Sequence, residues 1–488
     1  MKQKSLNLNM ILNAIKGLMA VVFPFITFPY VSRILGVESI GRYNFASSIA
    51  GYIILLAALG INTYAIREGA RVRDDKKKFA KLSDQIFTIN ILSTVFAYVV
   101  LAILLLVVPK IQGYTALILI LSSQMLFTAF GTEWMYSIYE EYAFITIRTI
   151  VFQIVSIILL FLFVKTEEDV NIYAVISLVS TSGANIFNYF YAKKYHRVRF
   201  TKNIEFKRHL KPILLLFAMA ATITIYVNSG TTILGFMSGD EAVGIYSVSA
   251  KVYTIIKNVV ASVVIVSIPR ISALLGGEKK EELSKTVKSI YSTLLTVVMP
   301  VSFGIAVLSR EIVLIIASEE FMRASPAIIV SAATMVMCLC AYFWGDGILV
   351  PFKKEKIVLR ATITSAIINV ILNVILIPIC NETAPAIATL ASETNAFIIC
   401  MIYGRKLIGN IGGLKTAIKT IIGSLPIVVY AIFLKPLIAN MYLYIIALVA
   451  LSGVSYLVIE LLLKNEVLYD IIAKIKKKKI LWYNPRKI

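Results

Sequence analysis

Five basic residues lie inside long apolar stretches of the sequence. Two are arginines, Arg148 and Arg360, and three are lysines, Lys16, Lys251 and Lys257. A lysine or arginine at the centre of a bilayer costs about 2.5–3.5 kcal/mol on insertion scales, so each should face a cavity, a partner or, near a helix end, the membrane surface. Cations in such places suit the binding of an anion, and lysine acts on phosphate as a point charge.

Each of the two arginines follows a carboxylate. Glu133 precedes Arg148 and Asp346 precedes Arg360, and the corresponding members are offset by 213 and 212 residues. We expect one ion pair at each place. The pairs either pin two helices together or form a gate on the cytoplasmic side, and a buried ion pair by itself does not distinguish these roles.

The three lysines have no such mirrored partner. Lys251 and Lys257 are about two turns apart on one expected helix, and Lys16 is on the first expected helix. Each can reach the membrane surface or form a local pair. The alternative, which we favour for Lys251 and Lys257, is a basic cavity for an anionic substrate.

These charges must be positioned by helices that cross a membrane. Of 488 residues 59% are hydrophobic and 16% are charged, against about 25% charged in a soluble domain. The composition excludes a soluble enzyme, a disordered chain and a disulfide-built secreted module. At about 35 residues per helix and loop, with roughly 20 apolar residues per span, the chain accommodates about 14 helices. We predict an all-α integral membrane protein with 14 transmembrane helices. The expected spans are 7–30, 42–66, 83–108, 114–135, 142–164, 170–192, 210–235, 243–269, 289–308, 324–350, 357–378, 384–404, 417–434 and 441–463.

Lysine and arginine in the loops set the orientation of such a chain. With the N-terminus inside, the inner segments hold 37 of the 49 lysines and arginines, and the outer segments hold 7. The net charge of +22 therefore reflects membrane topology, and we expect no nucleic-acid partner. A multi-pass protein with both termini in the cytoplasm is predicted.

Part of the sequence recurs within the chain. ILGVESIGRYNFASS begins at position 34 and ILGFMSGDEAVGIYSVSA at position 233. Gly41 corresponds to Gly244 and Tyr43 to Tyr246, with an offset of 203 residues. Together with the mirrored acid–arginine pairs, this recurrence predicts two six-helix lobes related by a pseudo-twofold axis. Such parallel repeats are typical of transporters with a path between the lobes.

The repeat divides the chain into three parts. Residues 1–205 form an N-lobe of helices 1–6, and residues 206–410 form a C-lobe of helices 7–12. Residues 411–488 add two helices and a basic cytoplasmic tail.

Enzymatic chemistry is not indicated. The two histidines share one basic loop, and no GxxxxGK loop is present, so the chain is not its own ATPase. We expect no catalytic residue and no metal site. The cysteines lie in or beside apolar segments, which argues against a disulfide framework or a zinc site; they are Cys338, Cys340, Cys380 and Cys400. Two intramembrane carboxylates, Glu393 and Glu460, are candidates for binding a coupling ion.

Three segments resemble one protein family. Residues 30–71, YVSRILGVESIGRYNFASSIAGYIILLAALGINTYAIREGAR, resemble the opening signature of Wzx-type flippases. These are the O-antigen and capsule repeat-unit transporters of the MOP superfamily. Residues 131–150, GTEWMYSIYEEYAFITIRTI, and the motif IPRIS at 268–272 resemble the same family.

The resemblance implies movement of an undecaprenyl-pyrophosphate-linked oligosaccharide from the inner to the outer leaflet of a bacterial plasma membrane. Alternating access of the two lobes would carry it, without covalent chemistry, for O-antigen or capsule biosynthesis. Lys16, Lys251 and Lys257 would hold the pyrophosphate, and Arg33 and Arg42 would receive it near the outer face. An ion gradient or the membrane potential would drive the step, with H+ or Na+ as coupling ion. The implied partners are the lipid-linked substrate, membrane lipid, a polysaccharide polymerase and export machinery.

Three other functions stay open. A MATE-type drug or cation exporter needs an acidic cavity, whereas the intramembrane charges without a mirrored partner are mostly basic. A peptidoglycan-precursor flippase also handles a pyrophosphate, so charge does not separate it, and only the motif at 131–150 favours the oligosaccharide family. A membrane scaffold without transport would leave the mirrored pairs and the basic cavity unexplained.

Overall fold

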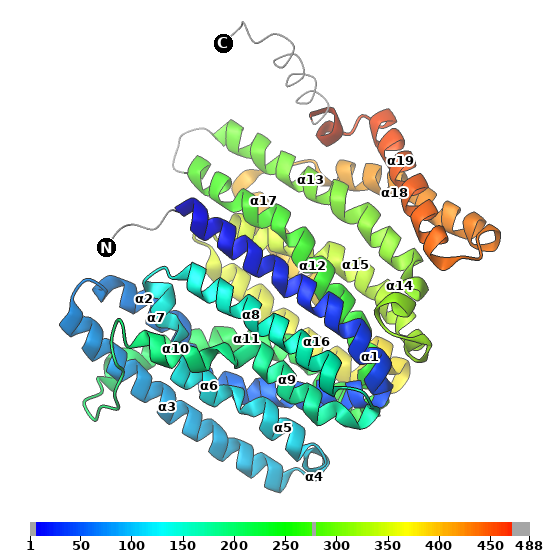
Figure 1. Cartoon of the computed structure of the whole chain (residues 1–488). Coiled ribbons are helices and arrows are strands. Elements are labelled where there is room, and N and C mark those ends of the chain that lie inside the picture. The colour runs from blue at the N-terminus through cyan, green and yellow to red at the C-terminus, as the bar shows by residue number, and fades with distance from the viewer. Residues whose placement is uncertain (1–5, 276–279, 471–488) are drawn as a thin grey trace, which may run out of the picture. The chain divides into compact units, whose positions relative to one another are not determined.

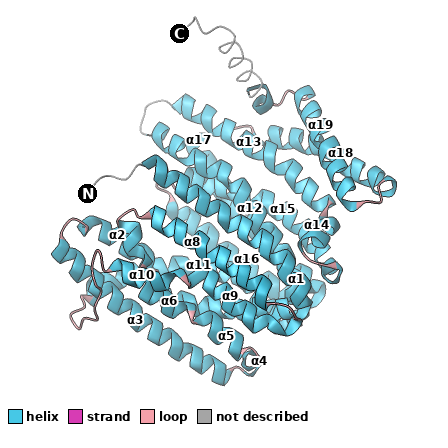
Figure 2. Cartoon of the chain, in the orientation of Figure 1, coloured by secondary structure: helices cyan, strands magenta, loops and turns pink. Residues whose placement is uncertain are grey.

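The computed structural model describes residues 6–275 and 280–470, and every regular element in these two ranges is a helix (Figures 1 and 2). The predicted all-α class is therefore confirmed. The chain divides into two compact units, which are described separately. Unit 1 comprises Met1–Ser247, Ile316–Phe321 and Val370–Pro385, and unit 2 comprises Val248–Ile315, Met322–Asn369 and Ala386–Ile488. The division into lobes at residues 205 and 410 stays a prediction.

The described part has ten helices that are long and apolar enough to cross a membrane, or up to eleven if a pair bent by 44° is one span. The number is below 14 in part because two pairs of predicted spans each share one apolar stretch. These pairs are 7–30 with 42–66, which overlap Gly17–Val72, and 357–378 with 384–404, which lie within Glu355–Ile408. A multi-pass membrane protein is thus established, and the number 14 stays a prediction.

Two further predicted spans fall on shorter or bent helices. The span predicted at 243–269 overlaps the bent pair Asp240–Ser262 and Ser267–Leu275, and the span at 114–135 overlaps the shorter apolar helix Thr115–Gly131. Each remaining predicted span overlaps one apolar helix of the described ranges. Hydrophobic length therefore located the helices but did not settle how many separate crossings they make.

Unit 1 is organised around its first helix, which packs against α3, α5, α8 and α11. Figure 1 shows α8 running alongside α1. The helices are α1 (Leu6–Ala58), α2 (Ile61–Val72), α3 (Lys76–Val107), α4 (Pro109–Gln112), α5 (Thr115–Ser122), α6 (Gln124–Gly131), α7 (Glu133–Ile138), α8 (Tyr142–Phe163), η1 (Glu167–Asp169), α9 (Val170–Ser182), α10 (Ala184–Ala192), α11 (Phe206–Ser238) and the start of α12 (Asp240–Leu275).

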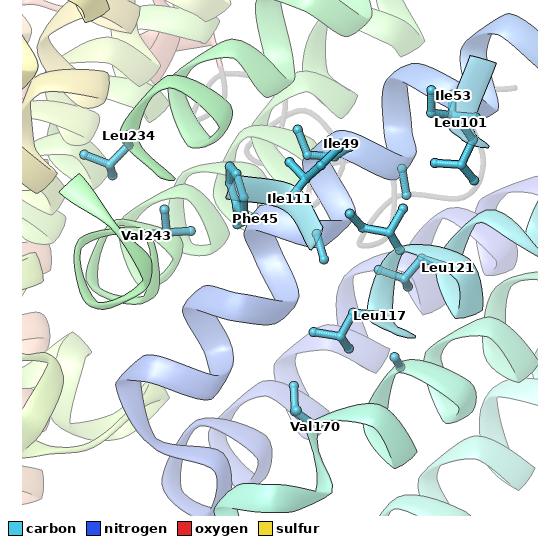
Figure 3. Packing of buried hydrophobic residues seen from close by; sticks show 14 of the residues in the cluster. Phe45, Ile49, Ile53, Leu101, Ile111, Leu117, Leu121, Val170, Leu234 and Val243 are labelled. Atoms are coloured by element: carbon cyan, nitrogen blue, oxygen red, sulfur yellow. The ribbon is translucent and has the colours of Figure 1, made fainter. Parts of the chain in front are cut away.

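A buried apolar cluster holds the first helix of unit 1 in place. Phe45, Ile49 and Ile53 on α1 belong to it, together with Leu101 and Ile111 from the following helices. Figure 3 shows Ile53 pointing toward Leu101 and Ile49 toward Ile111. Because these side chains are removed from both water and lipid, their packing fixes the position of α1 within the unit.

Unit 2 is organised around α13, which packs against α15 and α18, while α18 packs against α19. Its helices are the rest of α12, α13 (Lys280–Val307), α14 (Ser309–Ile316), η2 (Glu319–Ala324), α15 (Ser325–Tyr342), the π-helical η3 (Phe343–Leu349), α16 (Glu355–Cys380), α17 (Ala384–Ile408), α18 (Gly413–Leu437) and α19 (Met441–Leu462). Parts of α14, η2, α16 and α17 belong to the unit 1 segments given above, as does the whole of η4 (Asn381–Thr383).

The sequence repeat recurs as a repeat of backbone conformation in unit 1. Gly36 interrupts α1 with φ 67° and ψ −178°, and Gly239, 203 residues later, ends α11 with φ 87° and ψ −170°. This region of conformational space is essentially restricted to glycine. The repeated ILG triplets suggest a different pairing, of Gly36 with Gly235, but Gly235 is inside a helix and packs against Phe45. The structure therefore corrects the alignment of the triplets and keeps the offset of 203.

Candidate functional site

The two halves of the repeat meet where α1 and the start of α12 approach each other backbone to backbone. A Cβ atom on Gly41 would lie 1.8 Å from the carbonyl oxygen of Asp240, and one on Gly244 would lie 2.0 Å from that of Val37. Val37 and Asp240 are also 203 residues apart. Each glycine therefore meets the residue that corresponds to its partner's neighbour, so the contact is reciprocal, as at a local two-fold axis. Neither position accommodates any side chain larger than hydrogen at this separation.

Charged residues surround this crossing. The Tyr114 hydroxyl donates to both carboxylate oxygens of Asp240, at 2.7 and 2.9 Å. Arg42, Glu38 and Lys110 interact electrostatically with the same carboxylate. The group therefore contains two acids and two bases. Arg42, predicted to bind the substrate anion, is balanced by neighbouring acids in this conformation, so an anion would have to displace one of them.

Two other predicted substrate residues lie on α1. Arg33 is exposed, and its Nε donates to the Ala317 carbonyl oxygen at 2.9 Å. Lys16 is also on α1, but its side chain is outside the part of the chain that the structure describes.

Lys251 and Lys257 lie in the unit 2 part of α12, and both are half-buried. The Lys257 ammonium is 5.4 Å from the centre of the Tyr253 ring. It interacts electrostatically with Glu393 on α17 and with Cys338 on α15. Lys257 is thus a half-buried cation with an acidic side chain, Glu393, close to it, and its role in binding the substrate stays a prediction.

The first predicted ion pair joins two helices of unit 1. Arg148 Nη2 lies 2.9 Å from Glu133 Oε2, and the Arg148 side chain is only 8% exposed. Its guanidinium faces the rings of Tyr136 and Phe144, at 5.9 and 5.8 Å from their centres. Glu133 begins α7 directly after Thr132, whose φ of 43° breaks the preceding helix. The break directs the carboxylate toward α8.

The second predicted pair is not brought together. Asp346 lies half-buried in η3, whereas Arg360 is exposed on α16, and the described residues contain no ion pair between them. The physical reason is the wider π-helical turn, which replaces the sharp break found at Thr132. Asp346 instead interacts electrostatically with Lys257.

Reversing the charge of Glu133 with Glu133→Lys should sharply lower the amount of folded protein, because Arg148 would then be buried beside a like charge. Adding Arg148→Glu should restore most of the loss if the pair pins α7 to α8. The amount is measured by fluorescence-detected size-exclusion chromatography. If the double variant yields no more folded protein than either single variant, the pairing is contradicted. The control is Glu140→Lys, which reverses the charge of an exposed carboxylate paired with Arg73.

Glu460 is fully buried on α19. The amide of Asn465 donates to Glu460 Oε2 and also, at 3.2 Å, to Thr296 Oγ1. Glu460 Oε1 packs over Gly423, where a Cβ would approach it to 2.5 Å. These contacts tie α19 to α13 and α18 near the end of α19. Within the described ranges, no group of three or more His, Cys, Asp or Glu residues is arranged to hold a metal ion.

Sequence reasoning missed the role of His209. Both histidines are expected in one basic loop, yet His209 is fully buried at the start of α11. Its Nδ1 is 2.7 Å from the Tyr64 hydroxyl, and its Nε2 is 2.8 Å from Gln85 Oε1. The sequence signal was the position of this histidine at the very edge of a long apolar stretch, next to Leu210.

Comparisons with known proteins can now be set beside this geometry. The profile of a family described as polysaccharide biosynthesis protein matches residues 7–275. A protein of Escherichia coli (strain K12) described as an O-antigen transporter is 24% identical over 256 residues, which cover 52% of this chain and 62% of that protein. The match thus spans less than two thirds of this relative.

Two further similarities extend over more of the chain. A capsular polysaccharide biosynthesis protein of Staphylococcus aureus is 23% identical over 353 residues, which cover 70% of this chain and 84% of that protein. Among solved structures, lipid II flippase MurJ in an inward closed conformation superposes with a TM-score of 0.73 at 15% identity, over 95% of this chain and 99% of that one. At this identity the likeness shows a shared fold.

Proposed function

The chain belongs to the polysaccharide biosynthesis protein family, and from that premise we propose that it is a flippase for lipid-linked oligosaccharide repeat units. The resemblance to Wzx-type flippases is thereby confirmed at the level of the family. Its relatives include an O-antigen transporter and a capsular polysaccharide biosynthesis protein. Because one of these relatives is described as a transporter, we propose that the chain moves its substrate and does not catalyse a reaction on it.

The substrate we propose is an oligosaccharide linked through pyrophosphate to undecaprenol. Its pyrophosphate carries negative charge across a low-dielectric layer, and this charge must be matched by cations. We propose that the basic residues within the apolar helices supply these cations, and that Lys251 and Lys257 are the main ones. The proposed location is the bacterial plasma membrane with both termini in the cytoplasm, as the distribution of lysine and arginine favours.

Alternating access is the mechanism we propose, and the reciprocal glycine contact is the observation that carries it. The two halves of the repeat touch at Gly41 and Gly244 without intervening side chains. Two similar halves in contact at one such point can rock about it, whereas helices locked by interdigitated side chains cannot. We place this contact on the outer side of the membrane, because Gly41 lies on α1 between Arg33 and Arg42, which the distribution of lysine and arginine assigns to the outer face.

Deleting the gene in its native host tests the function. The lipid-linked oligosaccharides are then identified by mass spectrometry, and their sidedness is measured in spheroplasts. Accumulation at the cytoplasmic face, relieved by re-expression, is the expected result. A normal lipid-linked pool with increased drug sensitivity would support a cation exporter instead, and accumulation of the peptidoglycan precursor alone would support that substrate.

Replacing Lys251 with alanine should reduce transport to roughly a tenth or less while leaving the protein folded and inserted. Losing one charge-assisted contact to phosphate is worth about 1.5–3 kcal/mol, and about 1.4 kcal/mol corresponds to tenfold. Complementation of the deletion strain measures the effect. Lys285→Ala, which removes an exposed lysine paired with exposed Glu281, is the control, and wild-type transport by the Lys251 variant contradicts the assignment.

A further inference from the structure

A groove of about 310 Å³ lies on unit 1 between α6 and α10, two helices that pack against each other (Figure 1). The helices approach most closely at Gly131, where a Cβ would lie 2.7 Å from the Cβ of Asn185. The groove adjoins this contact, because Asn185 and Phe130 both line it, and its other walls are large apolar side chains. The lining residues are Leu126, Phe127, Phe130, Asn185, Ile186 and Phe190.

The groove opens on a surface that faces lipid. Ile186 and Phe190 are 49% and 61% exposed, and both lie on an apolar helix long enough to cross a membrane. Water does not fill such a groove, because an ordered water needs about two to four polar partners. The lining offers one polar side chain, Asn185, which already accepts a hydrogen bond from the Asn188 amide at 3.0 Å. Hydrocarbon is therefore the filling that this lining favours.

A basic segment begins next to the wall of the groove. The Lys193 ammonium lies 5.0 Å from the centre of the Phe190 ring, which is part of that wall. Lys193 is exposed and opens the segment 193–202, KKYHRVRFTK, which has five lysines and arginines and no acid. Glu141 and Asp84 each pair with one residue of this segment, so an excess of positive charge remains. An apolar groove thus adjoins a cationic surface.

We propose that the groove and Lys193 form a binding site for an anionic phospholipid, with an acyl chain in the groove and the phosphate at the Lys193 ammonium. The sixth expected span ends at residue 192. With the N-terminus inside, Lys193 lies at the cytoplasmic face, where anionic lipid attracts basic segments. A zwitterionic lipid has the same phosphate, but the basic segment repels its cationic group. The site is complete within unit 1, and it does not depend on which substrate the protein transports.

The length of the groove favours a phospholipid over the polyprenyl chain of a substrate. Leu126 to Phe130 and Ile186 to Phe190 each span about 6 Å along their helices. A groove of this length holds only part of any chain, so burial of hydrocarbon gives little preference between an acyl chain and a prenyl chain. The charge of the headgroup and the abundance of phospholipid in the bilayer then determine the occupant.

Quenching of tryptophan fluorescence by brominated lipid tests the proposal with the full-length protein in phosphatidylcholine vesicles. Phe190→Trp places the reporter in the groove wall. Ile223→Trp, at a similarly exposed position of α11 outside the groove lining, is the matched control. The probe is a minor amount of phosphatidylglycerol or phosphatidylcholine with brominated acyl chains, and the signal of the three native tryptophans is subtracted.

Brominated phosphatidylglycerol should be enriched about fivefold at Phe190→Trp relative to Ile223→Trp, as one lysine near the membrane surface contributes. Brominated phosphatidylcholine should quench the two reporters equally. Adding Lys193→Gln to Phe190→Trp should abolish the excess quenching. Lys285→Gln, which removes an exposed lysine of unit 2, should leave it unchanged. If Phe190→Trp does not fold, Leu126→Trp on the facing wall takes its place.

Four results would overturn the proposal. Equal quenching of both reporters by brominated phosphatidylglycerol would show that only ordinary membrane lipid touches the groove. An excess that persists with Lys193→Gln would exclude recognition of the headgroup by this lysine. Complete loss of the excess on adding an equal amount of undecaprenyl phosphate would assign the groove to a prenyl lipid. A groove reporter that neither probe quenches would assign the groove to a second copy of the chain.

Discussion

Replacing Gly41 with valine should abolish transport, with activity at or below a tenth of the wild type. The β-carbon alone would lie 1.8 Å from the Asp240 carbonyl oxygen, whereas carbon and oxygen atoms in contact need more than 3 Å. The clash is with backbone inside a helix, so no side-chain rotation relieves it. To make room for the valine, the two backbones must move apart by more than about 1 Å. This movement breaks the contact that we propose as the pivot of alternating access.

A matched glycine separates this effect from general intolerance to valine in a helix. Gly304 is inside α13, and a Cβ there would meet nothing within 4 Å. Gly304→Val should therefore keep most of the transport and the stability, because the side chain meets no neighbour and valine is no worse than glycine inside a helix. Gly244→Val should behave like Gly41→Val, because its Cβ would meet the Val37 carbonyl in the same way. Full transport by either variant of the crossing would contradict its role.

How far the sequence determines the structure differs between elements. Long apolar stretches located the helices, because a membrane span needs a fixed apolar length. The same criterion could not count the crossings around Gly36, where a single residue with positive φ interrupts a 53-residue helix. Hydropathy averages over many residues, and it does not register a break made by one glycine.

The candidate site was predictable where local geometry was simple. Glu133 and Arg148 were predicted to pair because the carboxylate ends one expected helix and the arginine starts the next, and they lie 2.9 Å apart. The same pattern at Asp346 and Arg360 did not bring those residues together, because the intervening turn is π-helical and Arg360 is exposed. A repeat in sequence preserves residue types, but it does not preserve the direction in which a side chain points once the helix geometry changes.

The surroundings of Lys257 were also beyond the reach of sequence. Apolar context predicted a buried cation, and Lys257 is half-buried. Its neighbours Asp346 and Glu393 come from 89 and 136 residues further along the chain. Only the packing of α12, η3 and α17 brings three such residues together, so the change from a purely basic cavity to a mixed-charge site follows from tertiary structure.

The buried histidine of unit 1 has a defined protonation state. Gln85 Nε2 donates to the Asn203 carbonyl oxygen at 2.7 Å, which fixes the orientation of this amide. Its Oε1 must then accept from His209 Nε2, so that nitrogen carries the hydrogen. His209 Nδ1 is left to accept from the Tyr64 hydroxyl. The neutral ring thus satisfies groups on α2 and α3 at once, and it links three helices of unit 1.

Replacing His209 with alanine should lower the free energy of unfolding by about 2–5 kcal/mol. The Tyr64 hydroxyl and Gln85 Oε1 each lose their hydrogen-bond partner, at about 1–3 kcal/mol each, and partial relaxation of the site keeps the sum below the upper limit of about 6 kcal/mol. The other histidine provides the control. His196 pairs with Asp84 at 2.8 Å, but its side chain is 21% exposed, so His196→Ala should cost about 1 kcal/mol or less. Denaturant unfolding of both variants in detergent measures the difference, and equal losses would show that His209 adds nothing beyond an ordinary surface contact.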